Sequence, residues 1–338
     1  MLSGAPANGG FVKLGGIKVL VTGAGGFIGS HLVERLTELG AHVRAMVRYN
    51  STGTAGWLDQ SPVRQDIDVV FSNVEDRDGV RKAMRGIDAA FHLAALIGIP
   101  YSYDAPDSYV RTNIGGTLNV LQAARDEQIG RVVHASTSEV YGSAAFVPMS
   151  EEHPLRGQSP YSATKIGADK LAEAFHLSFG LPVVTVRPFN TFGPRQSARA
   201  VIPTIITQAL NSSEIRLGNL EPTRDLNYVA DTVEGFIKAA ETPKAIGETI
   251  NLGSGREISI RDLAALILKL MNRDIPIALE GARVRPENSE VDRLCADSRK
   301  GQSILGWTPK YSLEDGLAAT VEWIRENSER YRTDIYVV

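Results

Sequence analysis

The feature that most constrains this chain is a glycine-rich turn set between a short apolar run and an amphipathic helical pattern. Residues 17–21 are largely apolar, TGAGGFIG follows at 22–29, and residues 30–39 carry apolar side chains at helical spacing. Glycines at positions 23, 26 and 29 permit a tight turn, close approach of the backbone to a pyrophosphate, and close packing of helix on strand. This context predicts a dinucleotide-binding unit with the phosphates at the helix N-terminus.

Apolar runs continue to alternate with helical stretches as far as residue 187. Further strands are expected at 43–47, 68–71, 89–93, 131–135 and 183–186, with helices that include 113–127 and 161–179. This alternation predicts a Rossmann-type doubly wound α/β fold, a parallel sheet covered by helices on both faces, with a smaller C-terminal lobe. The expected division is a flexible tail at 1–16, a dinucleotide-binding domain at 17–187 plus 227–254, and a substrate-binding lobe at 188–226 plus 255–326.

The composition excludes several classes of function. A net charge of −3 gives no electrostatic reason to expect nucleic acid or an anionic membrane as partner. No apolar run approaches the roughly 20 residues that cross a bilayer, and the glycine-rich N-terminus lacks the pattern of a signal peptide. Cys295 is the only cysteine, and the six histidines show no metal-ligand spacing, with His92 expected in the core. We therefore expect a cytoplasmic protein without a metal site.

The predicted helix at 161–179 has clear start and stop signals. Ser159 suits the N-cap, Pro160 suits the first helical position, and Gly180 suits the end of the helix. These signals place Tyr161 in the first turn of the helix.

Two short segments carry the groups expected for proton transfer. Tyr161 and Lys165 are four positions apart on the predicted helix, so their side chains share one face. An ammonium beside a phenol favours the phenolate, which would let Tyr161 act as a base near neutral pH. The segment STSE at 136–139 adds hydroxyl groups and a carboxylate. Together with the glycine-rich turn, these groups predict an enzyme that moves a proton and, with a nicotinamide cofactor, a hydride.

The end of the second predicted strand leaves the choice between NAD and NADP open. An acidic residue at this place would bind the adenine ribose of NAD, but this chain has VRYNS at 47–51. Arg48 and Ser51 could accept the 2′-phosphate of NADP; equally, Arg48 could stack on adenine while Asn50 bonds the ribose. Asn73 and Val74, after the third strand, either hold the adenine edge or form a plain loop.

These motifs together resemble the extended short-chain dehydrogenase/reductase superfamily, the nucleotide-sugar epimerases and dehydratases. Its markers stand here as TGAGGFIG (22–29), HLAA (92–95), Asn113, STSEVYG (136–142), YSATK (161–165), RPFNTFGPRQ (187–196) and TRDLNYV (223–229). The stretches QSPYSATKIGADKLAE and RPFNTFGPRQSARAVIPTI look most similar to 4,6-dehydratases of the legionaminic-acid type. The resemblance implies a homodimeric enzyme that acts on UDP- or GDP-N-acetylglucosamine.

The resemblance also implies roles for single residues. Tyr161 would be the base for the C4 hydroxyl of the sugar, with Lys165 as its partner and anchor of the nicotinamide ribose. Thr137 would donate a hydrogen bond to O4, and Glu139 would take the C5 proton. The remaining cofactor contacts that it implies are Gly23, Gly26, Phe27, Ile28, Gly29, Leu93, Ala94, Ala95, Asn113 and Ser136. The implied contacts to the substrate diphosphate are Asn190, Arg224 and Arg285, although Arg224 could instead form a salt bridge with Asp225 or Asp231.

Ser138 departs from the pattern of many hexose 4,6-dehydratases, which carry an Asp here as the acid for the departing C6 hydroxyl. A serine hydroxyl is a poor general acid because its pKa lies far above working pH, although it could relay a proton from water. Ser-Glu at this place also resembles UDP-glucuronate decarboxylases. A UDP-glucuronate decarboxylase is therefore one alternative. A 4-epimerase, in which Glu139 would be superfluous, and a non-enzymatic redox-sensing regulator are the others.

Overall fold

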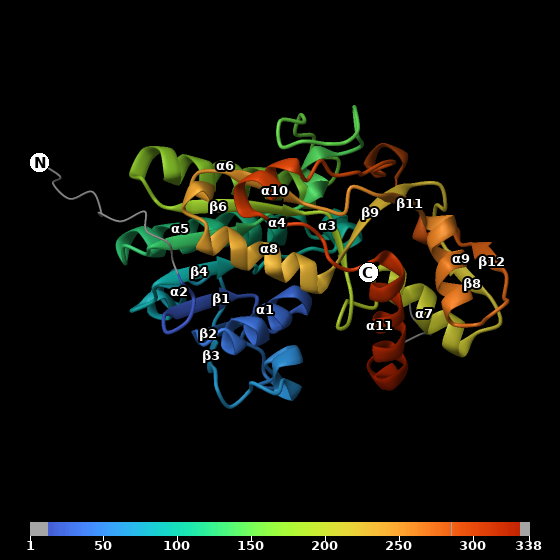
Figure 1. Cartoon of the computed structure of the whole chain (residues 1–338), viewed down its shortest axis with the longest axis horizontal. Coiled ribbons are helices and arrows are strands. Elements are labelled where there is room, and N and C mark those ends of the chain that lie inside the picture. The colour runs from blue at the N-terminus through green and yellow to red at the C-terminus, as the bar shows by residue number, and fades with distance from the viewer. Residues whose placement is uncertain (1–12, 285, 332–338) are drawn as a thin grey trace, which may run out of the picture.

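The central element of the computed structural model is a seven-stranded sheet, and the structure describes residues 13–331 except 285 (Figure 1). Its strands lie in the order β10-β6-β5-β4-β1-β2-β3, and every neighbouring pair is parallel. The strand bounds are β1 Lys18–Thr22, β2 His42–Val47, β3 Asp68–Phe71, β4 Ala89–His92, β5 Arg131–Ala135, β6 Val183–Pro188 and β10 Thr249–Leu252. The strand order reverses at β1, the place where open α/β sheets bind ligands. The predicted doubly wound fold is confirmed.

Helices cover both faces of this sheet, as the alternation of the sequence predicted. One face carries α1 (Phe27–Glu38), α8 (Val229–Glu241) and α10 (Arg299–Leu305), and the other carries α2 (Arg77–Met84), α5 (Gly116–Asp126) and α6 (Pro160–Phe179). Successive strand residues point to opposite faces. In β1, therefore, Val19 and Val21 are buried beneath α1 and α8, whereas Leu20 packs in the core beneath α2 and α5.

The ends of α6 follow from the residues that the sequence singled out. The Ser159 hydroxyl accepts a hydrogen bond from the Ser162 N–H at 3.1 Å, and the Ser162 hydroxyl accepts one from the Ser159 N–H at 3.0 Å. This reciprocal capping satisfies two backbone donors at the helix start. At the other end, Gly180 adopts the left-handed conformation with φ 66°. These caps hold Tyr161 in the first turn, directly beyond the capped end.

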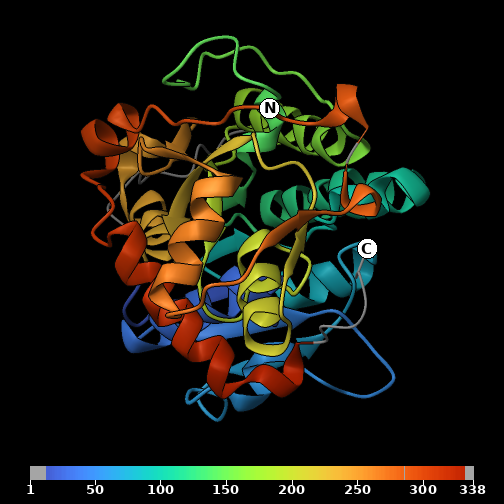
Figure 2. The ribbon, with the colours of Figure 1, turned by 90° about the vertical axis from the view of Figure 1, so that its right-hand side faces the viewer.

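A smaller lobe continues from the end of β6 and has its own core. It contains the three-stranded sheet β11-β9-β7 and the two-stranded sheet β12-β8. In Figure 2 this lobe faces the viewer, with its yellow, orange and red helices in front. Its elements are β7 Asn190–Phe192, α7 Val201–Asn211, β8 Ile215–Leu217, β9 Thr223–Tyr228, β11 Glu257–Ser259, α9 Ile260–Leu270, β12 Ile277–Leu279 and α11 Leu313–Glu326. Because β10 lies between β9 and β11 in the chain, the chain returns to the large sheet before re-entering this lobe. The exact domain division stays a prediction.

Three details differ from the expected element bounds. Of the expected tail at 1–16, residues 1–12 lie outside the described residues, but Leu14 is 1% exposed and packs in the core, so ordered packing starts before residue 17. Helix α1 begins at Phe27 rather than residue 30, directly after the glycine at its N-cap. A π-helical segment, Val110–Gly115, precedes α5, and the short helices α3 (Ile99–Asp104) and α4 (Pro106–Tyr109) lead into it.

The described residues contain neither a membrane-spanning helix nor a metal-binding cluster. Among the helices in residues 13–331, none is long and apolar enough to cross a membrane. In the same part of the chain, no group of three or more His, Cys, Asp or Glu side chains is arranged to hold a metal ion.

Candidate active site

The glycine-rich turn lies at the carboxyl end of β1, against the loop that follows β4. Gly23 has a φ of +71°, and a Cβ there would come within 2.8 Å of the Ala94 backbone nitrogen. A Cβ on Gly29 would collide with the carbonyl oxygen of Gly23. Gly26 is the N-cap of α1, no side chain caps this end, and the first turn contains no acidic residue. Backbone N–H groups at such a helix end attract an anion. The turn therefore fits the pyrophosphate of a dinucleotide.

The loop after β2 folds back onto this turn. The Trp57 N–H donates to the Gly25 carbonyl at 3.1 Å, and a Cβ on Gly25 would collide with the backbone of Ala55. Arg48 and Ser51 are exposed. The Asn50 amide, in contrast, donates to the Arg48 carbonyl at 3.2 Å and to the Thr54 carbonyl at 2.8 Å. Asn50 therefore closes its own loop instead of presenting its amide to a ribose.

The residues expected at the adenine edge behave differently from each other. Asn73 is exposed, whereas Val74 is 8% exposed and packs against Gly116 at the start of α5. The Asn119 amide donates to the Val74 carbonyl at 2.9 Å. Val74 therefore serves first as a packing contact between its loop and α5.

The loop with Leu93, Ala94 and Ala95 is held by Asn113. The Asn113 side-chain oxygen accepts from the Leu96 N–H at 2.8 Å, and its amide nitrogen donates to the Leu96 carbonyl and to the Thr164 hydroxyl, both at 3.0 Å. Asn113 is 1% exposed. It therefore acts by placing this loop against α6, and not through a side chain that faces a cofactor.

His92 is a core histidine with both ring nitrogens satisfied. The Thr117 hydroxyl donates to the Asn113 carbonyl at 2.6 Å, so it accepts from His92 Nε2 at 3.0 Å. His92 Nδ1 then accepts from the Thr22 hydroxyl at 2.8 Å. Burial lowers the pKa of His92 well below its usual value, so the ring is neutral. This ladder positions the end of β1 beside β4.

Thr137, Glu139 and Tyr161 meet at the carboxyl end of β5. The Thr137 hydroxyl accepts from the Glu139 N–H at 3.2 Å and so caps the short 3₁₀ turn Ser138–Tyr141. Burial is the main cause that raises the pKa of Tyr161, the Thr137 hydrogen bond opposes this rise, and the nearby Glu139 charge adds to it. The ring of Tyr109 packs edge-on against Tyr161, with 6.3 Å between ring centroids. The two segments singled out in the sequence thus form one cluster, in which Tyr161 is buried and Thr137 and Glu139 are half-buried.

Lys165 behaves differently from the sequence expectation. Its ammonium donates to the Ala135 carbonyl at 2.7 Å. Burial lowers the pKa of Lys165 to about 8, and the charge of Asp169 opposes that fall. The expectation that Lys165 brings the pKa of Tyr161 toward neutrality is wrong for the protein by itself, because Lys165 is not among the groups that shift this pKa and burial leaves it above its usual value.

Two serines near this cluster are buried. The Ser136 hydroxyl donates to the Asp169 carboxylate at 2.8 Å, so it is engaged away from the expected cofactor contact. Ser138 is 2% exposed and lies at the start of the 3₁₀ turn. No carboxyl group therefore occupies the position where many hexose 4,6-dehydratases carry an acid.

The expected diphosphate contacts lie in the smaller lobe. The side-chain oxygen of Asn190, at the start of β7, is buried and has no hydrogen-bond partner among the described residues. Arg224 in β9 is 8% exposed, and its guanidinium pairs with Glu290 at 3.1 Å. Glu290 is thus a salt-bridge partner that the sequence did not indicate. Arg285 lies outside the described residues.

The two carboxylates considered as partners of Arg224 serve the backbone instead. Asp225 accepts from the N–H groups of Ser254 at 2.8 Å, of Gly255 at 2.9 Å and of Ala296 at 2.9 Å. Asp231 accepts from the N–H groups of Lys310 and Tyr311 at 2.9 and 3.1 Å. Both carboxylates therefore hold loops of the C-terminal part in place.

Comparison with known proteins identifies the family. A family model described as GDP-mannose 4,6 dehydratase matches residues 20–320. A dTDP-glucose 4,6-dehydratase from Streptomyces griseus is 37% identical over 314 residues, 91% of this chain and 94% of the relative. The structure of a dTDP-glucose 4,6-dehydratase from Streptomyces venezuelae with NAD bound superposes with a TM-score of 0.85 and 31% identity, covering 94% of this chain and 99% of that one.

A second solved structure represents a different reaction. A UDP-glucuronic acid 4-epimerase from Bacillus cereus, in complex with UDP-glucuronic acid and NAD, superposes with a TM-score of 0.84 and 31% identity, covering 92% of this chain and 100% of that one. The chain belongs to the NAD-dependent epimerase/dehydratase superfamily. It is an enzyme of the nucleotide-sugar 4,6-dehydratase and epimerase group.

A set of buried groups that the sequence motifs do not indicate lies next to Lys165 and Ser136. Asp169 is 4% exposed and lies one turn after Lys165 on α6. It accepts hydrogen bonds from Ser136, His134 and Arg187. The signal that could have revealed it is an acidic residue four positions after Lys165, on the face of the helix expected to be buried.

Proposed function

We propose that this chain is an NAD-dependent nucleotide-sugar 4,6-dehydratase. The observation that carries the proposal is the cluster at the end of β5, where Thr137 and Glu139 lie close enough to the Tyr161 phenol to shift its pKa in opposite directions. A 4,6-dehydration needs one base for the C4 hydroxyl and a second base for the C5 proton. The two dTDP-glucose 4,6-dehydratases described above support this reaction, since they match nearly the whole chain.

The proposed cofactor is NAD. The glycine turn at 23–29, with its uncapped helix end, fits a dinucleotide pyrophosphate. Both solved relatives described above hold NAD. When bound, NAD would supply a hydride acceptor and a positively charged ring. A positive charge near Tyr161 would favour its phenolate and oppose the rise in its pKa that burial causes.

The proposed steps assign one task to each side chain. Tyr161 takes the proton of the sugar C4 hydroxyl as that carbon is oxidised, with Thr137 hydrogen-bonded to the same oxygen. The resulting ketone acidifies the C5 proton, which Glu139 removes. The C6 hydroxyl leaves as water, with Ser138 as hydrogen-bond donor or relay. The hydride taken from C4 is returned to C6, and the proton held by Glu139 is returned to C5, so the 4-keto-6-deoxy sugar forms without net oxidation.

The proposed substrate is a nucleoside diphosphate hexose. Asn190 offers a buried carbonyl oxygen that has no hydrogen-bond partner in the part of the chain that the structure describes, which suits a sugar hydroxyl or a ribose hydroxyl. Arg224 is suited to the diphosphate, because a guanidinium matches phosphate geometry. The dehydratase relatives act on dTDP-glucose by name. The N-acetylglucosamine substrate expected from the motifs remains a proposal, and dTDP-glucose is the first substrate to test.

A 4-epimerase is the second candidate, and Ser138 is the observation that favours it. A buried serine replaces the acid that would protonate the departing C6 hydroxyl. The UDP-glucuronic acid 4-epimerase shows that a relative of the same fold catalyses that reaction. Loss of the C6 carboxylate from UDP-glucuronic acid is the related alternative.

Product analysis by mass spectrometry tests the proposal. The purified protein is incubated with dTDP-glucose, UDP-glucose, UDP-N-acetylglucosamine and UDP-glucuronic acid, each with NAD. A dehydratase lowers the product mass by one water, a decarboxylase lowers it by carbon dioxide, and an epimerase leaves it unchanged. Epimerised product of unchanged mass, with no dehydrated product from any of the sugars, would overturn the dehydratase proposal.

A further inference from the structure

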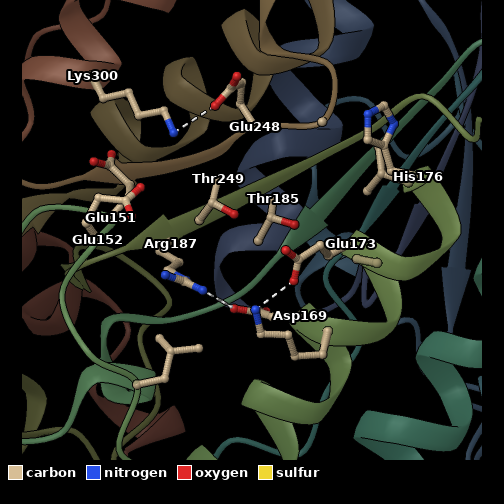
Figure 3. A pocket seen from close by; sticks show the side chains of 15 residues that line it. Glu151, Glu152, Asp169, Glu173, His176, Thr185, Arg187, Glu248, Thr249 and Lys300 are labelled. Atoms are coloured by element: carbon tan, nitrogen blue, oxygen red, sulfur yellow. Dashed lines mark hydrogen bonds and ion pairs between the residues drawn. The ribbon is translucent and has the colours of Figure 1, made fainter. Parts of the chain in front are cut away.

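The buried carboxylate of Asp169 has no task in the steps above, although it lies next to the groups that perform them. Asp169 Oδ2 accepts from the Ser136 hydroxyl at 2.8 Å and from Arg187 Nε and Nη2 at 3.1 and 3.0 Å. Asp169 Oδ1 accepts from His134 Nε2 at 3.2 Å. Figure 3 shows the Arg187 side chain pointing toward Asp169. Both residues line a pocket of about 340 Å³. Lys165 and Tyr161 do not line this pocket.

Asp169 and Lys165 together tie one turn of α6 to two adjacent residues at the end of β5. Lys165 donates to the carbonyl of Ala135 at 2.7 Å, and Asp169 accepts from the hydroxyl of Ser136. Thr137 follows immediately in the chain. The two bonds therefore set the position of the segment 137–139 relative to the helix that carries Tyr161. A displacement of about 1 Å between such groups can cost roughly 100-fold in rate.

Asp169 also supplies a negative charge near Lys165, because the two residues lie four positions apart on α6 and are both buried. Burial by itself would raise the pKa of Asp169, but the His134 hydrogen bond and the charge of Arg187 outweigh it, so its pKa lies below the usual value. The carboxylate is thus ionised at neutral pH. Its charge opposes the effect of burial on the pKa of Lys165.

Apart from Arg187, the ionisable groups around Asp169 and Lys165 are either neutral groups, such as the buried histidines, or residues that line the pocket. Burial lowers the pKa of His92 on β4 and of His134 on β5, so both rings are uncharged. Arg187 on β6 is charged and pairs with Asp169. The charged residues on the pocket side of Asp169 are Glu151, Glu152, Lys170, Glu173, Glu248 and Lys300. Asp169 is the group among these that shifts the pKa of Lys165.

We propose that Asp169 is a positioning residue for the reaction: it holds the Lys165 ammonium in its charged form and, through Ser136, fixes the segment 137–139 against α6. This inference rests on the proposed role of Lys165 but does not depend on which sugar the enzyme converts. It has two separable parts, a charge effect that belongs to Asp169 alone and a clamp that belongs to the pair Asp169 and Ser136.

The charge effect is tested by following the titration of Lys165 in protein labelled with ¹³C-lysine, using the Cε resonance assigned with Lys165→Arg. Wild type should titrate near the pKa of about 8. Asp169→Asn should lower the midpoint by about one pH unit. Ser136→Ala and the control Asp231→Asn should leave it in place. An unchanged midpoint in Asp169→Asn would overturn the counter-charge. This measurement needs no substrate, so it can succeed or fail independently of the proposed reaction.

The clamp is tested by kinetics on the substrate that the wild type converts. Ser136→Ala should lower kcat by roughly tenfold without moving the alkaline limb of the pH profile. Asp169→Asn should lower kcat and also move that limb to lower pH, because Lys165 loses its proton earlier. Wild-type kcat in Ser136→Ala would overturn the clamp.

Asp169→Asn leaves the buried Arg187 without its carboxylate, and the single variant could fail to fold for that reason. A double variant then provides the same test of the charge effect. Asp169→Asn/Arg187→Met removes both buried charges, a replacement that proteins tolerate better than a lone buried ion. Arg187 is not among the groups that shift the pKa of Lys165. The Lys165 midpoint should therefore fall in the double variant too, and a wild-type midpoint would again overturn the counter-charge.

Discussion

The proposed catalytic half of the site and its proposed diphosphate half are built in different ways. Tyr161 and Lys165 stand on one capped helix of 20 residues, and Thr137 follows a central strand of the large sheet. Asn190 and Arg224 stand on strands of 3 and 6 residues in the smaller lobe, and Arg224 pairs with Glu290 in a long loop. The proposed catalytic groups therefore stand on regular elements and are placed by their spacing along the chain. The proposed substrate contacts depend instead on segments that are far apart in the sequence.

Tyr161→Phe should give the largest effect on turnover, because it removes the proposed base from the catalytic half. The ring still packs against Tyr109, so the fold should be retained. We expect kcat to fall by about 10²–10⁴-fold, the usual contribution of general base catalysis, measured by product formation. Circular dichroism serves as the control for folding. Near-normal turnover by this variant would mean that the cluster of Tyr161, Thr137 and Glu139 is not the catalytic half.

Arg224→Ala probes the other half. We expect weaker binding of UDP or dTDP by about 1.5–3 kcal/mol, the range for hydrogen bonds to charged groups, measured by calorimetry, with NAD binding intact. Arg195→Ala is the matched control, because it breaks the Arg195–Glu34 ion pair, whose side chains are 15% exposed, outside this site. If nucleotide affinity stays at the wild-type value, the Arg224–Glu290 pair is structural and the lobe does not bind the diphosphate through it.

Arg48→Asp should give the smallest effect. Arg48 is exposed at the end of β2, and the proposed cofactor NAD has no 2′-phosphate for it to bind. We expect the affinities for NAD and NADP to fall together, by less than about 1 kcal/mol, as for other exposed charges. Fluorescence titration of both cofactors measures this. A selective loss of NADP binding would show that Arg48 meets a 2′-phosphate.

The same comparison explains what could be predicted from the sequence. Spacing along one element sufficed for the glycine turn and for Tyr161 with Lys165, and the ends of α6 followed from Ser159 and Gly180. Local signals of this kind do not depend on the rest of the fold.

Local sequence patterns do not predict contacts between elements that are far apart in the chain. Asp169 is surrounded by groups from β5 and β6, and Arg224 meets Glu290 across 66 positions of the chain. The pKa of Tyr161 was mispredicted for the same reason, because burial depends on packing that spacing along a helix does not reveal.

The central claim is that the catalytic half removes two protons in sequence, the first with Tyr161 and the second with Glu139. Glu139→Gln tests it most directly, because glutamine keeps the size of the side chain but cannot accept the C5 proton. The variant is mixed with NAD and the sugar that the wild type dehydrates, and the absorbance of reduced nicotinamide is followed. The account predicts that reduced cofactor accumulates and persists, without dehydrated product and without solvent deuterium at C5. Dehydrated product at the wild-type rate would contradict it.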